Sequence, residues 1–181
     1  MANRYPRLDA KLVDFIERQK LFFVATAARE GKVNVSPKGM DTLRVLDEQR
    51  LIWLNLTGSG NETAAHLLDS NRMTLMFCSF DRDPLILRLY GEAETLHPHN
   101  RDWPKLIEHF PHYPGSRQIF DLRIEVVQTS CGFAVPLFDF AGERNTLEAW
   151  ANRKGDAGIR QYWSEKNSIN IDGMTTGILP E

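Results

Sequence analysis

One segment of the sequence combines glycines with side chains that donate hydrogen bonds. Residues 57–63 have the sequence TGSGNET, and the donors are Thr57, Ser59, Asn61 and Thr63. A strand pattern ends before this segment and a helical pattern follows it, so backbone N–H groups converge beside the start of a helix. Such a corner stabilises an anion, above all a phosphate. The segment therefore predicts a phosphate cradle.

The same residues also allow an interpretation without a ligand. Ser59 or Asn61 would then be an ordinary N-cap that satisfies the free amides of the helix. The segment is neither a Walker A sequence nor a complete GxGxxG, so it carries no nucleotide fingerprint. Residues 57–63 alone leave both interpretations open.

A second candidate is the segment Ser36-Pro37-Lys38-Gly39, which interrupts an alternating strand pattern. Proline removes a ladder donor and glycine relaxes the backbone, so the strand must open here. An opened strand offers amides and carbonyls to a flat ligand, and Lys38 would add positive charge. The alternative is a bulge with a solvated lysine.

A third candidate is Arg88, which lies inside the apolar strand pattern of residues 85–91. Alternation places it on the face opposite Leu87 and Leu89. An arginine there would bind a phosphate or a carboxylate. It would otherwise face solvent or form a structural ion pair.

Other reaction chemistries find little support in the sequence. His97 and His99 flank a proline, but no carboxylate or cysteine stands at a useful ligand spacing, so no metal site is expected. No GxSxG elbow or other local nucleophile signature occurs. No pair of carboxylates is distinguished from the surface charges, so no catalytic residue is assigned.

Composition limits the remaining classes. The 181 residues carry 22 Lys and Arg against 24 Asp and Glu, a net charge of −2, which argues against nucleic-acid binding. No apolar run approaches the length of about 18 residues that a membrane helix needs, and no secretory signal is expected. Cys78 and Cys131 form no CxxC and are expected to be buried reduced thiols of a cytoplasmic protein.

The periodicity predicts a chain rich in strands. Strands are expected over residues 21–26, 33–36, 42–46, 51–56, 73–80, 85–96 and 119–129. Helices are expected near residues 8–19, 61–70 and 98–110, and two more are separated by glycines after residue 141. Residues 168–181 have little periodicity and are expected to pack on a partner or to fray.

These elements define a fold class. Strands joined mainly by turns precede any long helical pattern, whereas a parallel doubly wound sheet would alternate strand and helix. We expect a mainly β (α+β) fold: an antiparallel barrel or rolled sheet with peripheral helices. At this length about one domain is expected. It would span residues 1–181, with the barrel over about 1–140 and helices and a tail over about 141–181.

Taken in order, these motifs resemble the pyridoxamine 5'-phosphate oxidase-like flavoproteins. The resemblance covers about residues 10–135. It rests on the opened strand SPKG, the segment WLNLTGSGNETAAHL at residues 53–67, the segment RMTLMF at residues 72–77 and RLYG at residues 88–91. The later segments SCGFAVP at residues 130–136 and IDG at residues 171–173 look like features of one subgroup.

The resemblance implies a split β-barrel that pairs into a homodimer, with FMN in the groove between the subunits. Residues 57–63 would hold the FMN phosphate, and Arg88 would also approach it. Residues 36–39 would lie along the ribityl chain or the flavin ring, where a cation such as Lys38 would raise the flavin potential. The implied function is an FMN-dependent oxidoreductase acting on an unidentified small molecule.

The sequence departs from the oxidase itself in two places. Glu62 and Thr63 stand where the oxidase has an Arg-Lys pair, and the chain ends without the oxidase's arginine-containing substrate motif. Oxidation of pyridoxamine phosphate is therefore not implied. Two other functions remain open: a flavin- or haem-binding module, with His66 or His97 as the haem ligand, and a structural dimer that has lost its ligand.

Overall fold

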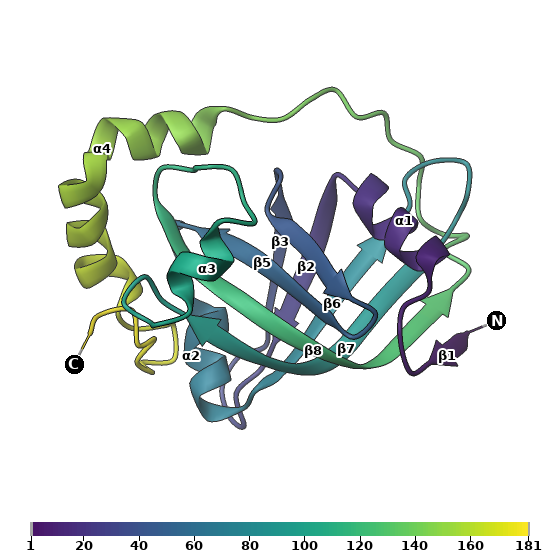
Figure 1. Cartoon of the computed structure of the whole chain (residues 1–181), viewed down its shortest axis with the longest axis horizontal. Helices are drawn as coiled ribbons and strands as arrows, with labels where there is room; N and C mark the ends of the chain where they lie inside the picture. The colour runs from purple at the N-terminus through teal and green to yellow at the C-terminus, as the bar shows by residue number, and fades with distance from the viewer. Residues whose placement is uncertain (1, 181) are drawn as a thin grey trace.

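The chain folds around one strongly curled antiparallel sheet, which a computed structural model describes together with its helices over residues 2–180 (Figure 1). The strands are β1 (Asn3–Tyr5), β2 (Leu21–Thr26), β3 (Asn34–Gly39), β4 (Leu43–Asp47), β5 (Arg50–Leu56), β6 (Arg72–Cys78), β7 (Ile86–Leu96) and β8 (Ser116–Ser130). The prediction of a rolled antiparallel sheet with a few helices is confirmed.

The strand order is β3-β2-β6-β7-β8-β5-β4, and the short β1, which the sequence did not reveal, pairs with β8. The long strands β7 and β8 form the spine of the sheet. Their register shifts between Tyr90 and Gly91. A Cβ atom at Gly91 would lie only 1.9 Å from the carbonyl oxygen of Arg123, so only glycine lets the two backbones approach there.

Aromatic side chains fill the concave face of the sheet. The rings of Trp53 and Phe120 stack with centroids 4.5 Å apart, and Phe22 meets Trp53 edge-on and lies against Phe77. All four side chains are buried. Burying each contributes about 1.5–3 kcal/mol, so this cluster is a principal source of stability.

The two edge strands β3 and β4 are consecutive in the chain, although they lie at opposite ends of the strand order. Residues 40–42 make the crossing between them. Met40 has a φ of 62°, which an L residue rarely adopts. Thr42 holds the crossing in place, since its hydroxyl donates to the Gly39 carbonyl at 2.8 Å and its carbonyl accepts from the Leu54 amide at 2.8 Å.

The helices lie at the periphery: α1 (Ala10–Arg18), α2 (Glu62–Asp69), α3 (Trp103–Ile107) and α4 (Thr146–Tyr162), with a π-helical turn, η1 (Trp163–Asn167), after α4. Helix α4 is broken at Gly155, where φ is 61°, as the glycine spacing predicted. Among the described residues, no helix has the length and apolar character that crossing a membrane requires.

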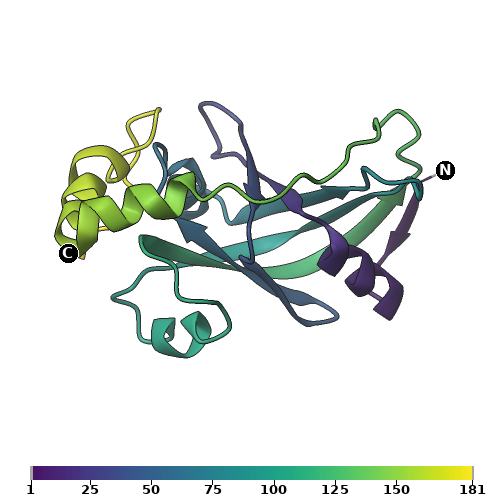
Figure 2. The ribbon, with the colours of Figure 1, turned by 90° about the horizontal axis from the view of Figure 1, so that it is seen from above.

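Residues 131–145, which we call the strap, join β8 to α4 without regular structure. The strap returns along the molecule from the end near β1 to the opposite end, where α4 and the C-terminal tail lie (Figure 2). The tail, residues 168–180, was expected to fray or to pack on a partner. It instead packs on its own chain beside α2, as hydrogen bonds from Asn167, Ile171 and Thr176 show.

Two other expectations were wrong. The helix predicted over 98–110 is reduced to α3, because residues 97–100 form a turn in which the Asn100 side chain accepts from the His97 amide at 2.6 Å. Cys131 was expected to be buried, but it is exposed at the start of the strap, whereas Cys78 is buried in β6.

Candidate functional site

A cavity of about 150 Å³ lies where β3, β5 and the start of β8 meet the N-terminus of α2. Ser36, Lys38, Asn61 and Thr63, all predicted to bind a ligand, line it together. The fold thus brings residues 36–38 and the glycine-rich loop, which are separate in the sequence, to one place. The prediction that the strand opens at residues 36–39 was wrong, because β3 pairs with β2 from Asn34 to Gly39 without a shift in register, and Pro37 is accommodated in this edge strand. The full lining consists of Asn34, Ser36, Lys38, Asn55, Gly60, Asn61, Glu62, Thr63 and Arg117.

Strand alternation orients the first wall of this cavity. Asn34, Ser36 and Lys38 share one face of β3, whereas Val35 and Pro37 point to the exposed face. The Asn34 amide donates to the Thr63 hydroxyl at 3.2 Å and accepts from the Ser36 hydroxyl at 3.0 Å. A hydrogen-bonded chain therefore connects β3 to the first turn of α2.

Lys38 is the cation of this wall. Its ammonium donates to Asn55 Oδ1 at 3.3 Å and lies 5.3 Å from the centroid of the Trp53 ring. Burial, together with the nearby positive charge of Arg117, lowers the pKa of Lys38 to about 8. An anion beside Lys38 would relieve both effects.

Arg117 is a second cation, and the sequence analysis missed it. Asn55 on β5 pairs with Gln118, and the next residue, Leu56, pairs with Ser116, so Arg117 is the extra residue of a β-bulge. A bulge re-aims its side chain. The side chain enters the cavity, where Nη1 donates to the Gly60 carbonyl at 3.0 Å. Simple alternation along β8 could not have indicated this orientation.

Among residues 2–180, the charge of Arg117 has no counterion. The residue is 2% exposed, and its Nε has no hydrogen-bond partner. Burial lowers its pKa to about 10, so it stays positive at neutral pH. Within residues 2–180, neither Arg117 nor Lys38 pairs with a carboxylate. A buried arginine and a half-buried lysine, neither paired with a carboxylate within residues 2–180, make this cavity a candidate site for an anion.

The N-terminus of α2 adds backbone donors. Asn61 occupies the N-cap position, but its side chain makes no capping hydrogen bond. It donates to the Asn167 carbonyl at 3.0 Å instead, and its Oδ1 is buried without a partner. The interpretation of Asn61 as an ordinary N-cap is therefore wrong, and the first amides of α2 have no side-chain acceptor from it.

Thr57 and Ser59 have different surroundings in the loop. The Thr57 hydroxyl donates to the Gly115 carbonyl at 2.7 Å and accepts from the Trp163 indole at 2.8 Å, so its proton is already committed. Gly115 has a φ of 75°, and a Cβ there would lie 3.4 Å from the same hydroxyl. Ser59 is exposed at the tip of the loop.

Arg88 lies far from this cavity within one chain. Arg88 pairs with Gln128 on β8. Gln128 comes eleven residues after Arg117 on the same strand, so at about 3.3 Å per residue Gln128 and Arg117 are roughly 35 Å apart along β8. The Nη1 of Arg88 donates to the Ser130 hydroxyl at 3.4 Å. A role for Arg88 at a ligand bound here would require the site of another subunit.

The two histidines considered as haem ligands are buried. His66 is 1% exposed, and its Nδ1 is 3.1 Å from the Thr26 hydroxyl. His97 stacks on His99 with ring centroids 5.2 Å apart, and burial lowers the pKa of His97 to about 4. Neither ring faces an open surface, and among the described residues no cluster of three metal-ligating side chains occurs.

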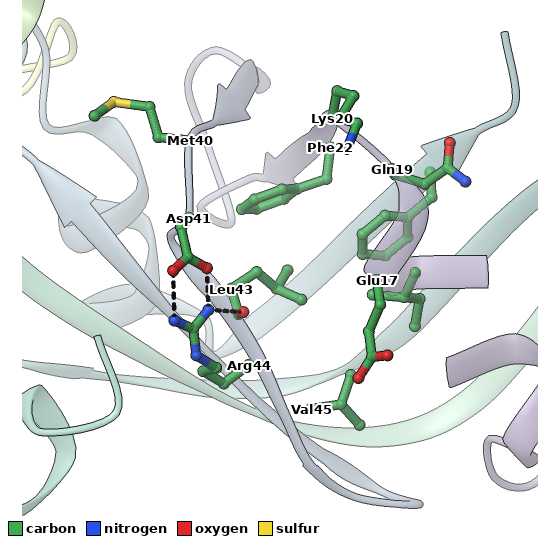
Figure 3. Close-up of a pocket in the computed structure, with 11 residues that line it drawn as sticks. Glu17, Gln19, Lys20, Phe22, Met40, Asp41, Leu43, Arg44 and Val45 are labelled. Atoms are coloured by element: carbon green, nitrogen blue, oxygen red, sulfur yellow. Dashed lines mark hydrogen bonds and ion pairs between the residues drawn. The ribbon is translucent and has the colours of Figure 1, made fainter. Parts of the chain in front are cut away.

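A larger cleft of about 340 Å³ lies between the end of α1 and β4 (Figure 3). Its floor includes the buried rings of Phe22 and Phe77. On its rim the guanidinium of Arg44 faces the carboxylate of Asp41, with Nη2 donating to Oδ2 at 2.8 Å. The positive charge of Arg44 is thereby matched within the protein, and Glu17 adds further negative charge.

These features agree with the sequence comparisons. The family model described as pyridoxamine 5'-phosphate oxidase matches residues 8–131, close to the predicted span of 10–135. The chain therefore belongs to the pyridoxamine 5'-phosphate oxidase family. The Aspergillus flavus pyridoxamine 5'-phosphate oxidase family protein ustO is 34% identical over 190 residues, covering 94% of this chain and 76% of that protein.

Solved structures share the fold at lower identity. A protein of Lactobacillus delbrueckii, proposed to be a pyridoxamine 5'-phosphate oxidase, has a TM-score of 0.55 and 21% identity, covering 68% of this chain and 94% of that one. A Mesorhizobium loti protein described as FAD-binding has a TM-score of 0.50 and 14% identity, covering 71% and 97%. At such identities the likeness concerns the fold.

Proposed function

We propose that this protein binds FMN and acts as a flavin-dependent oxidoreductase on a small molecule. The observation that carries the proposal is a pair of cations, the half-buried Lys38 and the buried Arg117. They line one cavity beside the uncapped start of α2 and have no carboxylate partner within residues 2–180. A phosphate dianion supplies the missing negative charge and accepts the free amides.

The donor set of the cavity fits a phosphate ester. Lys38 contributes an ammonium, Arg117 a guanidinium with an unused N–H, and Ser36 and Thr63 contribute hydroxyls. This set replaces the Arg-Lys pair that the oxidase carries at Glu62 and Thr63. The positive charge has moved from the helix to strands β3 and β8, so the loss of those two cations does not abolish phosphate attraction.

The size of the cavity indicates how the rest of the cofactor is held. A volume of about 150 Å³ is below the range of roughly 300–1,000 Å³ that encloses a drug-sized ligand. The cavity therefore suits the phosphate and the adjoining end of the ribityl chain. The flavin ring would lie outside it, along residues 36–39 and against another surface.

That other surface is supplied by a second copy of the chain in our proposal. Large apolar side chains are exposed around β3 and along the strap, where a subunit contact would cover them. A homodimer would place the flavin ring in the groove between subunits, where Arg88 of one subunit could reach the cofactor of the other. The exposed residues are Val33, Val35, Phe133, Leu137, Phe138 and Phe140.

Bound FMN would supply the redox chemistry, which is the transfer of a hydride or electrons to or from a small molecule. The chain itself binds and orients the cofactor: Lys38 and Arg117 hold its phosphate, and residues 36–39 exclude water from one side. The flavin-binding description of the Mesorhizobium loti neighbour supports the cofactor class. The small cavity favours a mononucleotide.

Titration of the purified protein with FMN and with riboflavin tests this proposal. We expect FMN to bind at micromolar concentration with a shifted flavin spectrum, and riboflavin to bind much more weakly because it lacks the phosphate. FMN at about 100 times its Kd should stabilise the fold by about 2.7 kcal/mol. No binding, or equal affinity for the two flavins, would contradict the phosphate site.

The oxidoreductase role needs a second measurement. Under anaerobic conditions, the FMN-loaded protein is mixed with small organic reductants and nicotinamides, and bleaching of the flavin is followed. Bleaching faster than that of free FMN is expected for at least one compound. If the flavin bleaches at the rate of free FMN with every compound, the oxidoreductase role is contradicted and only cofactor binding remains.

Glu62 favours one alternative, a structural dimer without a ligand. Its carboxylate lines the cavity and would repel a phosphate. In that case FMN, riboflavin and inorganic phosphate would all leave the melting temperature unchanged. A rise with FMN alone excludes this alternative.

A further inference from the structure

The C-terminal segment, which lies beyond the span of the family model, contacts the glycine-rich loop directly. The Trp163 indole donates to Thr57 at 2.8 Å. The Asn167 side-chain amide donates to the carbonyls of Gly58 at 3.1 Å and Ser59 at 3.5 Å. The π-helical turn η1 therefore holds residues 57–59, although it lies more than a hundred positions later in the chain.

Asn167 is the centre of this contact. It is fully buried, and its backbone carbonyl accepts from the Asn61 side chain at 3.0 Å and from the Thr176 hydroxyl at 2.6 Å. One residue thus links the loop, the start of α2 and the tail. A buried amide with this many partners fixes its neighbours in a single arrangement.

The arrangement fixes the direction of the loop amides. Asn167 and Arg117 together hold the carbonyls of Gly58, Ser59 and Gly60. In a planar trans peptide, the carbonyl of one residue and the N–H of the next point in opposite directions. The N–H groups that follow these carbonyls therefore point away from both donors, and they have no acceptor among residues 2–180.

The tail also holds Glu62. The backbone N–H of Ile171 donates to Glu62 Oε2 at 3.2 Å. Farther along, Asp172 accepts from the Lys32 amide at 2.9 Å and pairs with its ammonium at 2.6 Å, which lowers the pKa of the Asp172 carboxyl. A carboxylate that stands where the oxidase has a cation is thus held by the tail.

We propose that Asn167 is a positioning residue for phosphate binding, and that residues 163–176 form a clasp that holds the glycine-rich loop in one conformation beside the ligand. This inference rests on the proposed function for the identity of the ligand, and on hydrogen bonds within the chain for the ordering of the loop. The clasp adds orientation to charge, because a loop with fixed backbone dipoles acts beside the cations Lys38 and Arg117.

The test compares three variants. Asn167→Leu keeps the approximate volume and removes the amide that holds the two carbonyls. Trp163→Phe removes only the indole donor and serves if Asn167→Leu fails to fold. Ser168→Ala is the matched control, because the Ser168 hydroxyl bonds only the Ser164 carbonyl in the same turn and does not touch the loop.

Two readouts separate positioning from general stability. The first is the ratio of FMN to riboflavin affinity, because a loosened loop weakens only the phosphate contact. We expect Asn167→Leu to lower FMN affinity about tenfold and to leave riboflavin affinity within about twofold, with a smaller effect for Trp163→Phe. The second is the NMR order parameter of the Ser59 and Gly60 amides in the cofactor-free protein, which should fall in both variants and not in Ser168→Ala.

The outcomes are distinct from those of the proposed function. If the wild-type protein binds no FMN, the proposed function fails, and the order parameters still decide whether the clasp orders the loop. Equal loss of FMN and riboflavin affinity, or unchanged order of the loop in both variants, overturns the inference.

Discussion

Two cavities of this protein, the cleft between α1 and β4 and the cavity beside α2, differ in how their charges are balanced. The cleft between α1 and β4 has the larger volume, about 340 Å³, but its arginine, Arg44, already has a carboxylate partner in Asp41 (Figure 3). The cavity beside α2 has about 150 Å³ and two cations without carboxylates. Charge that the protein leaves unmatched, rather than volume, therefore marks the cavity beside α2 as the candidate anion site.

Desolvation is the energetic reason why an anion is expected in the cavity beside α2 and not in the cleft beside β4. An ion pair such as Arg44–Asp41 compensates the cost of removing each charge from water, so it gains little from a further ligand. Lys38 and Arg117 have lost hydration, as their lowered pKa values indicate, without gaining a counterion. Their contribution is realised only when an anion is bound.

The largest difference in FMN affinity is expected when one arginine in each cavity is replaced by methionine. Arg117→Met removes a charged donor from the α2 cavity, and FMN affinity should fall about a hundredfold. Arg44→Met, the matched substitution in the larger cleft, should leave it within about twofold. Isothermal titration of both variants with FMN measures the difference. Similar losses in the two variants would show that the comparison between the cavities is wrong.

Measuring FMN affinity over a pH series tests the role of Lys38. Its pKa of about 8 lies below its ordinary value of 10.5. Bound phosphate favours the charged ammonium, so FMN affinity should fall as pH rises through about 8.

The same pKa shift predicts a pH dependence of the stability of the cofactor-free protein. Between pH 8 and 10.5 the unfolded chain binds more protons at Lys38 than the folded chain does, so Lys38 makes the protein more stable as pH rises through that window.

Lys38→Met supplies the control for this series. It should lower FMN affinity about tenfold at neutral pH and remove both pH dependences assigned to Lys38. Denaturant unfolding of the cofactor-free protein and FMN titration are repeated at each pH. A pH dependence that persists in Lys38→Met must come from another group.

The smallest effect is expected at Glu62. Glu62→Gln removes one negative charge from the cavity and keeps an oxygen that accepts from the Ile171 amide. FMN affinity should rise about threefold, because a partly exposed charge is screened by solvent. Flavin fluorescence titration at low ionic strength resolves a change of this size. Weaker binding would mean that the charge on Glu62 supports the clasp more than it opposes the phosphate.

The sequence predicted the parts of the site that local patterns govern. The loop before a helix placed Asn61 and Thr63 at the start of α2, whereas Pro37 and Gly39 wrongly suggested that the strand opens at residues 36–39, where β3 in fact pairs with β2 throughout. The sequence did not reveal Arg117, because a bulge between β5 and β8 re-aims that side chain and depends on pairing between distant strands.

The C-terminal segment shows the same limit. Nothing periodic marks residues 168–180, and their order comes from single hydrogen bonds to residues about a hundred positions earlier. The turn at residues 97–100 likewise replaced the start of a predicted helix through one side-chain contact. The predicted strands, by contrast, are present in the structure, because each one is held by many contacts with neighbouring strands of the sheet.

The strap has a consequence for how the molecule is divided along its chain. It is largely exposed and without regular structure, and it is the covalent link between the complete set of strands and the clasp. A single nick by a protease between residues 133 and 145 would leave every strand pairing intact while freeing the element that orients the loop. The sheet and the clasp are thus separate pieces of the chain joined by one accessible segment.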